Sequence, residues 1–258
     1  MIKPWFFRGQ TLLYRPFRAP AEPMLSIAEN LEKADERIRA AAAQAGRDSA
    51  GVRLLAVSKK QPAGAIRKAA AHGQIAFGEN YVQEALEKID ALSDLVDLEW
   101  HFIGPIQSNK TRAIVEHFDW VHSVDRIKIA QRLSEQRPGQ RPPLNICLQV
   151  NLDGEDTKSG ATPDEIPELA TAVSRLAGCR LRGLMAIPDP ANSPDQQRQR
   201  FRDLALLLAQ VRNEVDNGRL DTLSMGMSAD LEAAIAEGAT MVRLGTALFG
   251  PRDQDARP

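Results

Sequence analysis

The sequence predicts an α/β fold of one domain, a (β/α)8 barrel of the TIM type. About eight short apolar runs alternate with helix-like segments along the chain, which is the pattern of a parallel barrel. The runs are continuously apolar, as expected for strands that are buried on both faces. A chain of 258 residues also has an ordinary length for a single barrel of this kind.

The composition limits the classes of partner and the cellular compartment. Lys and Arg number 33 against 34 Asp and Glu, so the net charge is -1 and we expect neither a nucleic-acid nor a membrane partner. Cys147 and Cys179 fall in separate apolar runs, which favours buried, reduced thiols and a cytoplasmic location. The histidines lack metal-ligand spacing with the cysteines, so no metal site is predicted.

The first residues differ in character from the rest of the chain. In residues 1–23 arginines interrupt the apolar pairs, so no signal-peptide core forms. We expect a disordered extension, or one that lies upstream of a start at Met24, and the alternative is a transit-like or partner-binding arm. Ser26 and Glu29 have the spacing of a capping box, which predicts that a helix begins there and ends at Gly46. We therefore place the barrel domain at residues 24–252 and a short tail at residues 253–258.

The remaining elements follow in alternation, each bounded by Pro, Gly or a polar turn. Pro62 fits the first turn of the helix that follows the first strand. Ser108 and Ser228 are expected to cap the helices that follow them. Strands are predicted at residues 54–57, 75–77, 98–103, 120–124, 144–150, 181–187, 220–224 and 241–244, and helices at 62–71, 81–92, 109–118, 126–136, 163–176, 194–215 and 229–237.

Lys59 ends the first apolar run and is the first candidate for chemistry. Strand ends at the carboxyl side of a parallel barrel carry the active site, and alternation gives Lys59 the same face as Leu55 and Val57. An amine against apolar walls has a lowered pKa and can form a Schiff base with a carbonyl. The alternative from the residues alone is an ordinary solvated lysine at a strand end.

A second group of candidates follows the last two strands, where barrels commonly bind phosphate. Gly245 allows close backbone approach, while the hydroxyls of Thr246 and Ser228 could donate to a phosphate. The alternative is ordinary turn and cap chemistry. Arg243 could hold a pyridine nitrogen unprotonated or form a salt bridge at the rim, and Lys158 could be a second amine or a solvated loop lysine.

Six motifs together resemble the pyridoxal phosphate homeostasis protein family, which is related to the N-terminal barrel of fold-type III enzymes such as alanine racemase. The motifs are AVSK at 56–59, FGENYVQE at 77–84, WHFIGPIQSNK at 100–110, RGLMAIP at 182–188, LSMGMS at 223–228 and MVRLGTALFG at 241–250. The resemblance covers essentially residues 24–252. It implies a single barrel that binds pyridoxal 5'-phosphate (PLP).

The resemblance also implies roles for individual residues. Lys59 would hold PLP as a Schiff base, and Asn80 would lie near the cofactor ring. Arg243 would face the pyridine nitrogen. The residues implied for the phosphate are Ser228, Gly245 and Thr246. Gln61 stands where the family often has a second lysine, so transfer through a neighbouring lysine is not expected at that position.

The resemblance favours a carrier in vitamin B6 homeostasis over an enzyme. An unprotonated pyridine nitrogen makes PLP a poor electron sink, and racemases of this fold use a tyrosine base from a second domain. The chain's tyrosines are Tyr14 in the extension and Tyr81. An amino-acid racemase is the second hypothesis and a class I aldolase-like barrel the third. Apo-enzymes that need PLP are the expected recipients, and the expected state is a monomer or weak homodimer.

Overall fold

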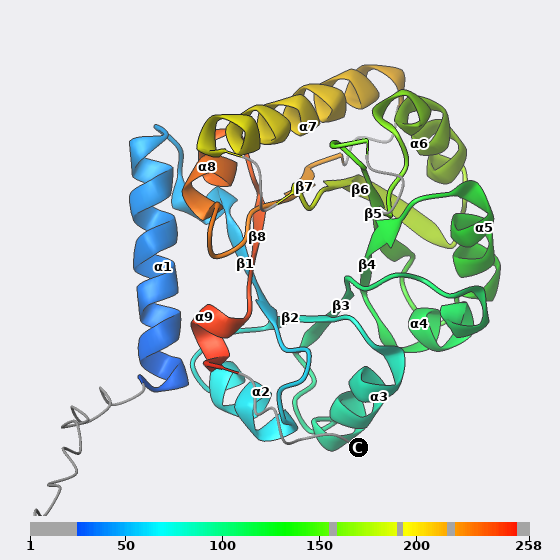
Figure 1. Ribbon diagram of the computed structural model, residues 1–258. Helices are drawn as coiled ribbons and strands as arrows, with labels where there is room; N and C mark the ends of the chain where they lie inside the picture. The colour runs from blue at the N-terminus through cyan, green and yellow to red at the C-terminus, as the bar shows by residue number, and fades with distance from the viewer. Residues whose placement is uncertain (1–24, 155–158, 190–192, 216–219, 252–258) are drawn as a thin grey trace, which may run out of the picture.

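Eight parallel strands form a closed barrel in which each strand pairs with its neighbour in sequence and β8 pairs with β1. The computed structural model describes residues 25–154, 159–189, 193–215 and 220–251. The predicted extension and tail, and Lys158, lie outside these residues. Figure 1 looks down the barrel and shows the helices arranged around the ring of strands. The (β/α)8 prediction is therefore confirmed.

The elements alternate as the apolar pattern predicted. The strands are β1 (Arg53–Val57), β2 (Ala76–Glu79), β3 (Glu99–Phe102), β4 (Trp120–Val124), β5 (Leu144–Gln149), β6 (Cys179–Met185), β7 (Thr222–Ser224) and β8 (Met241–Leu244). The helices are α1 (Ile27–Gln44), α2 (Ala63–Ala70), α3 (Val82–Ala91), α4 (Thr111–His117), α5 (Ile127–Gln136), α6 (Ile166–Ser174), α7 (Pro194–Glu214), α8 (Leu231–Ala236) and α9 (Thr246–Phe249). Short 3-10 helices lie at Ser49–Gly51, Ser108–Lys110 and Pro163–Glu165.

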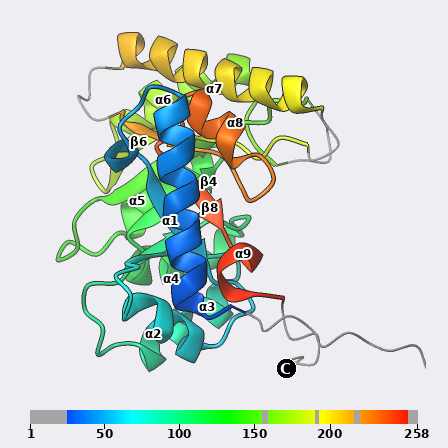
Figure 2. The same cartoon turned by 90° about the vertical axis from the view of Figure 1, so that its left-hand side faces the viewer.

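Helix α1 precedes the repeating units and packs on the outside of the barrel against α8, α9 and α2 (Figure 2). Its start is the predicted capping box, in which the Ser26 hydroxyl accepts from the Glu29 N–H and the Glu29 carboxylate accepts from the Ser26 N–H. The Asn30 amide donates to the Leu248 carbonyl over 2.9 Å, which ties α1 to α9. The last element of the chain is thereby held against the first.

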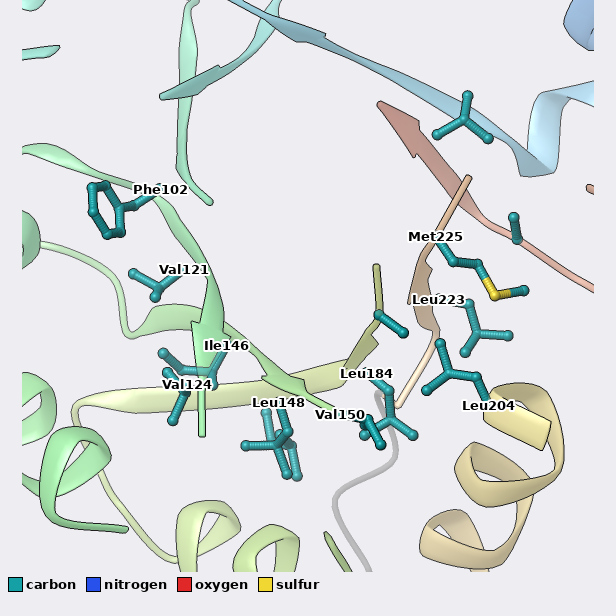
Figure 3. Close-up of a cluster of buried hydrophobic side chains, with 14 of the residues drawn as sticks. Phe102, Val121, Val124, Ile146, Leu148, Val150, Leu184, Leu204, Leu223 and Met225 are labelled. Carbon is teal, nitrogen blue, oxygen red and sulfur yellow. The ribbon is translucent and has the colours of Figure 1, made fainter. Parts of the chain in front are cut away.

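The core has two layers because successive strand residues point to opposite sides of the sheet. Val121, Ile146 and Leu184 belong to the main apolar cluster, which lies between the strands and the helices (Figure 3). Trp120 and Cys147 pack in a separate buried cluster with Met185, on the inner side. The barrel interior is therefore filled by side chains from several strands.

Three local predictions were wrong. Gly78 and Glu79 belong to β2 and not to the loop after it. Ser108 begins a 3-10 turn and caps no helix, since α4 starts only at Thr111. Ser228 lies in the turn before α8, where the Asp230 carboxylate accepts from the Met227 N–H instead. In both cases an extra turn separates the serine from the first helical residue.

Candidate functional site

The carboxyl ends of β1 and β8 lie side by side and bring two predicted groups together. Leu55 pairs with Arg243 along these strands. A Cβ on Gly245 would lie 3.3 Å from the Val57 carbonyl oxygen, so the chain after β8 runs close to the end of β1. Lys59 follows two residues after Val57. The structure therefore brings Lys59 and Gly245 to one mouth of the barrel, as predicted.

The turn that carries Lys59 is fixed by its two neighbours. Ser58 is buried, and its hydroxyl donates to the Glu79 carboxylate over 2.6 Å. Lys60 has φ of 59°, the left-handed region, and is the one non-glycine residue with positive φ among those described. Its N–H donates to the Glu84 carboxylate. Hydrogen bonds on both sides thus constrain the backbone at Lys59, which is itself partly buried.

A buried ion pair lies directly behind this turn. The Lys88 ammonium donates to the Glu79 carboxylate over 2.7 Å and to the Glu84 carboxylate over 2.6 Å. It also donates to the Ser58 carbonyl over 2.7 Å. Burial raises the pKa of Glu79, while the charge and hydrogen bond of Lys88 act in the opposite direction. Sequence reasoning missed Lys88, although its spacing of four from Glu84 on one helix was a signal.

Arg243 lies inside the barrel and is buried. One terminal nitrogen of its guanidinium donates to the Ser224 carbonyl over 2.6 Å and to the Ser224 hydroxyl over 2.9 Å. The other donates to the Ala186 carbonyl over 2.9 Å. Burial lowers the pKa of Arg243 to about 10, so the guanidinium remains charged at neutral pH. The acceptors are neutral carbonyl and hydroxyl groups, so among the residues described Arg243 does not form the salt bridge at the barrel rim that was the alternative from the sequence.

Asn80 follows β2 at the same end of the barrel. The Gly104 loop packs so tightly there that a Cβ on Gly104 would lie 2.1 Å from the Asn80 carbonyl oxygen. The side-chain Oδ1 of Asn80 is buried and has no hydrogen-bond partner. A buried amide oxygen without a donor costs about 1–3 kcal/mol, and such groups are retained where a ligand completes them. Asn80 therefore fits a polar contact to a bound group.

The proposed phosphate residues occupy the loops after β7 and β8. The Arg243 N–H donates to the Gly226 carbonyl over 2.9 Å, which holds the loop after β7 against β8. Ser228 is exposed in that loop, and Thr246 is the first residue of α9 and also exposed. Both hydroxyls thus lie on loops at the carboxyl end of the barrel.

His101 is a core residue whose ring nitrogens both have hydrogen-bond partners. It is buried on β3, stacks on Trp120 with ring centroids 5.4 Å apart, and shares a 2.9 Å hydrogen bond with His122. His122 in turn lies 2.9 Å from the Ser224 hydroxyl. Sequence reasoning did not single out Ser224 as the partner of Arg243, or His122 as the partner of Ser224. They belong to strands whose side chains meet only when the barrel closes.

The site offers an amine, a buried cation and an unpaired amide oxygen at one end of the barrel. This set suits an aldehyde that carries a ring nitrogen, because the amine can form a Schiff base with it. Among the residues described, no group of three or more His, Cys, Asp or Glu side chains is placed to hold a metal ion. Over the same ranges, no helix has both the length and the apolar character needed to cross a membrane.

Comparison with known proteins gives a consistent result. The family model described as alanine racemase, N-terminal domain, matches residues 30–253. The pyridoxal phosphate homeostasis protein of Pseudomonas aeruginosa is 63% identical over 233 residues, 90% of this chain and 99% of the relative. The protein of the same name from Escherichia coli is 51% identical over 232 residues, 89% of this chain and 98% of the relative.

Solved structures agree with the sequence relatives. PipY of Synechococcus elongatus, solved with PLP bound, is 40% identical with a TM-score of 0.78, covering 87% of this chain and all of that one. Alanine racemase from Corynebacterium glutamicum is 18% identical with a TM-score of 0.63, covering 90% of this chain and 63% of that one. The latter likeness concerns the fold.

Proposed function

The chain belongs to the pyridoxal phosphate homeostasis proteins, a branch of the alanine racemase N-terminal domain family, and we propose that it holds PLP on Lys59 and releases it to other proteins. The observation that carries the assignment is the position of Lys59, at the end of β1 beside Gly245. When bound, PLP supplies an aldehyde that an amine can capture reversibly as a Schiff base.

The other site residues have distinct roles in this proposal. Arg243 presents a permanent positive charge to the pyridine nitrogen and so keeps that nitrogen unprotonated. Asn80 lies near the cofactor ring, where the bound cofactor gives a partner to its unpaired amide oxygen. Gly245 lets the chain after β8 run close to Val57, and the hydroxyls of Ser228 and Thr246 donate to the phosphate.

The test of the amine uses two adjacent lysines. Lys59→Ala should abolish the visible absorbance of the PLP-loaded protein and the adduct that borohydride traps. Lys60→Ala is the matched control, because Lys60 is exposed and contributes its backbone N–H to the turn. Recovery of the trapped adduct on Lys60 or Lys158 in the wild-type protein would refute the assignment.

The phosphate site is tested by removing both hydroxyls. Each hydrogen bond to a charged group is worth roughly 1.5–3 kcal/mol, so Ser228→Ala with Thr246→Ala should weaken PLP binding on the order of 10²-fold or more. Pyridoxal, which has no phosphate, should bind the wild-type protein and the double variant about equally. An equal loss for the two ligands would refute the phosphate assignment.

The carrier role is favoured over an amino-acid racemase by the charge at Arg243 and by the position of Tyr81. Tyr81 lies at the start of α3 and is 52% exposed, whereas a catalytic base would have to reach the cofactor. Tyr14 lies outside the described residues. We expect negligible incorporation of deuterium from solvent into the α-carbon of alanine, and rapid incorporation by the wild-type protein would refute the carrier role.

The same proposal covers the recipient and the compartment. Apo-enzymes that need PLP are the recipients, and the chain acts in the cytoplasm as a monomer or weak homodimer without a nucleic-acid or membrane partner. Buried, reduced thiols support the cytoplasmic assignment. Mixing the loaded protein with an apo-enzyme and following recovered activity tests transfer, with Lys59→Ala as the control. The absence of recovery above that control would refute the carrier role.

A further inference from the structure

A continuous chain of side-chain hydrogen bonds links residues of β1 and β3 to β8 through β4 and β7. Its terminal groups are the Arg53 and Arg243 guanidiniums. Arg53 lies 2.8 Å from the Glu99 carboxylate, which lies 2.6 Å from Nε2 of His101. Nδ1 of His101 lies 2.9 Å from Nε2 of His122. The Ser224 hydroxyl lies 2.9 Å from Nδ1 of His122 and 2.9 Å from the Arg243 guanidinium. It joins the amino-terminal end of the barrel to the buried cation of the cofactor site.

The carboxylate end of the chain determines which nitrogens carry protons. Burial acts to raise the pKa of Glu99, but the hydrogen bonds from His101 and Arg53 and the charge of Arg53 outweigh it and hold that pKa at about 2. Glu99 is therefore an acceptor, and His101 donates to it through Nε2–H. Burial lowers the pKa of His101, so its ring is neutral and its Nδ1 accepts from Nε2–H of His122.

The other end leads to the same assignment. Burial, together with the positive charges of Arg243 and Arg53, lowers the pKa of His122 well below its usual value. A neutral His122 that donates through Nε2 must accept at Nδ1, so the Ser224 hydroxyl donates to it. That hydroxyl oxygen accepts from Arg243, which has only donors. Every bond between Arg243 and Glu99 is therefore donated in the direction of Glu99, and Arg53 donates to the same carboxylate from the other end.

The bonds at Ser224 also orient the guanidinium. A guanidinium has five N–H donors, and the three bonds to Ser224 and Ala186 occupy three of them. Two donors remain for a ligand. One of the three fixed acceptors is the Ser224 hydroxyl, so the direction of these two donors depends on that side chain and on its own partner, His122.

We propose that Ser224 and His122 are positioning residues that aim the Arg243 guanidinium at the pyridine nitrogen of the cofactor, through a chain that fixes both histidines as Nε2–H tautomers. The inference rests on the proposed function for the role of Arg243 toward PLP. The order of donors within the chain is a property of the protein alone, and it can be measured without cofactor.

The first measurement is nitrogen NMR of histidine-labelled protein without PLP. We expect His101 and His122 to appear as neutral Nε2–H tautomers from pH 6 to 8. Ser224→Ala should change the Nδ1 signal of His122, and Ser224→Thr, which keeps the hydroxyl, should restore it. An Nδ1–H tautomer or an imidazolium at either histidine in the wild-type protein would overturn the direction of the chain.

The second measurement is cofactor binding by the same variants. Ser224→Ala should weaken binding of both PLP and pyridoxal by roughly tenfold and shift the visible band, because Arg243 loses an acceptor and its orientation. His122→Phe should have a similar effect, and Ser224→Thr should be close to wild type. Unchanged affinity and spectrum in Ser224→Ala would overturn the positioning role.

Controls separate this proposal from general destabilisation and from the proposed function. Ser123→Ala removes a buried hydroxyl from the residue next to His122, where it donates to the Gly104 carbonyl over 2.6 Å outside the chain. That variant should keep the tautomer signals and the visible band. Lys59→Ala should lose the band yet keep the tautomer signals. If the wild-type protein shows the expected tautomer signals but no PLP band, the proposed function is refuted. If His101 or His122 of the wild-type protein is not the Nε2–H tautomer, the proposed hydrogen-bond chain is refuted.

Discussion

Replacing Lys88 with methionine should show how strongly the turn at Lys59 depends on a residue outside the turn. The Lys88 side chain is 7% exposed and donates to three oxygens, those of Glu79, Glu84 and the Ser58 carbonyl. Methionine keeps most of the apolar stem but offers no donor. The Glu79 carboxylate, which is fully buried and already has one unpaired oxygen, then keeps only the Ser58 hydroxyl.

The magnitude follows from the burial of the pair. Breaking a buried ion pair by removing one partner costs about 3–5 kcal/mol, whereas replacing both partners with apolar residues is often close to neutral. We therefore expect Lys88→Met to lower the free energy of unfolding by about 3–5 kcal/mol. Adding Glu79→Leu should recover about half of that loss, because no unpaired carboxylate remains buried.

Urea denaturation at pH 7 of the wild type, both single variants and the double variant measures this coupling. Lys128→Met on α5 is the control, since Lys128 is an exposed helical lysine and its replacement should change stability by less than about 0.5 kcal/mol. PLP affinity should fall in Lys88→Met because the Ser58 carbonyl is released. If Lys88→Met and Lys128→Met were equally stable, the pair would not hold the turn.

Three further outcomes are expected. Folding lowers the pKa values of Glu99, His101 and His122, so the unfolded chain binds more protons than the folded one at acidic pH. The urea midpoint should therefore fall as the pH drops below about 6.5, where unfolded histidines gain protons, and fall further below about 4.5, where the unfolded glutamate does. A midpoint that stays constant from pH 7 to 4 would contradict this. Burial raises the pKa of Cys147 and of Cys179 to about 12, so iodoacetamide at pH 8 should label neither thiol until denaturant is added, as mass spectrometry would show. Deleting residues 1–23 should leave PLP affinity unchanged in a titration, because the family model matches only from residue 30.

The barrel and many of its boundaries could be predicted because they depend on local patterns. Strands β4 and β8 have the predicted bounds, since a buried parallel strand is a continuous apolar run that ends at a polar turn. The capping box of Ser26 and Glu29 was also predictable, because its partners are three residues apart. Lys59 could be singled out for the same reason, as the first charged side chain after such a run.

The side-chain networks could not be predicted, since their partners are far apart in the sequence. His122 and Ser224 are 102 residues apart, and nothing in either local segment indicates the other. Glu79 was expected in a loop, yet as the last residue of β2 it is directed to Lys88 on α3. Ser228 looked like a helix cap, but α8 begins only at Leu231, and the point at which a helix starts after such a turn depends on packing.

Two polar networks support the two charged groups of the site from different sides. Lys59 is held through its backbone, because the partners of Ser58 and Lys60 lie on β2 and α3. Arg243 is held through its side chain, because its acceptors lie on β7 and at the end of β6. The turn thus fixes the position of Lys59 through its backbone neighbours, while the guanidinium is fixed through its own hydrogen bonds. A substitution such as Arg243→Glu would set a carboxylate against the Ser224 and Ala186 oxygens, so the acceptors that orient the cation also disfavour an acidic residue there. This arrangement agrees with reversible capture of PLP without activation of its ring.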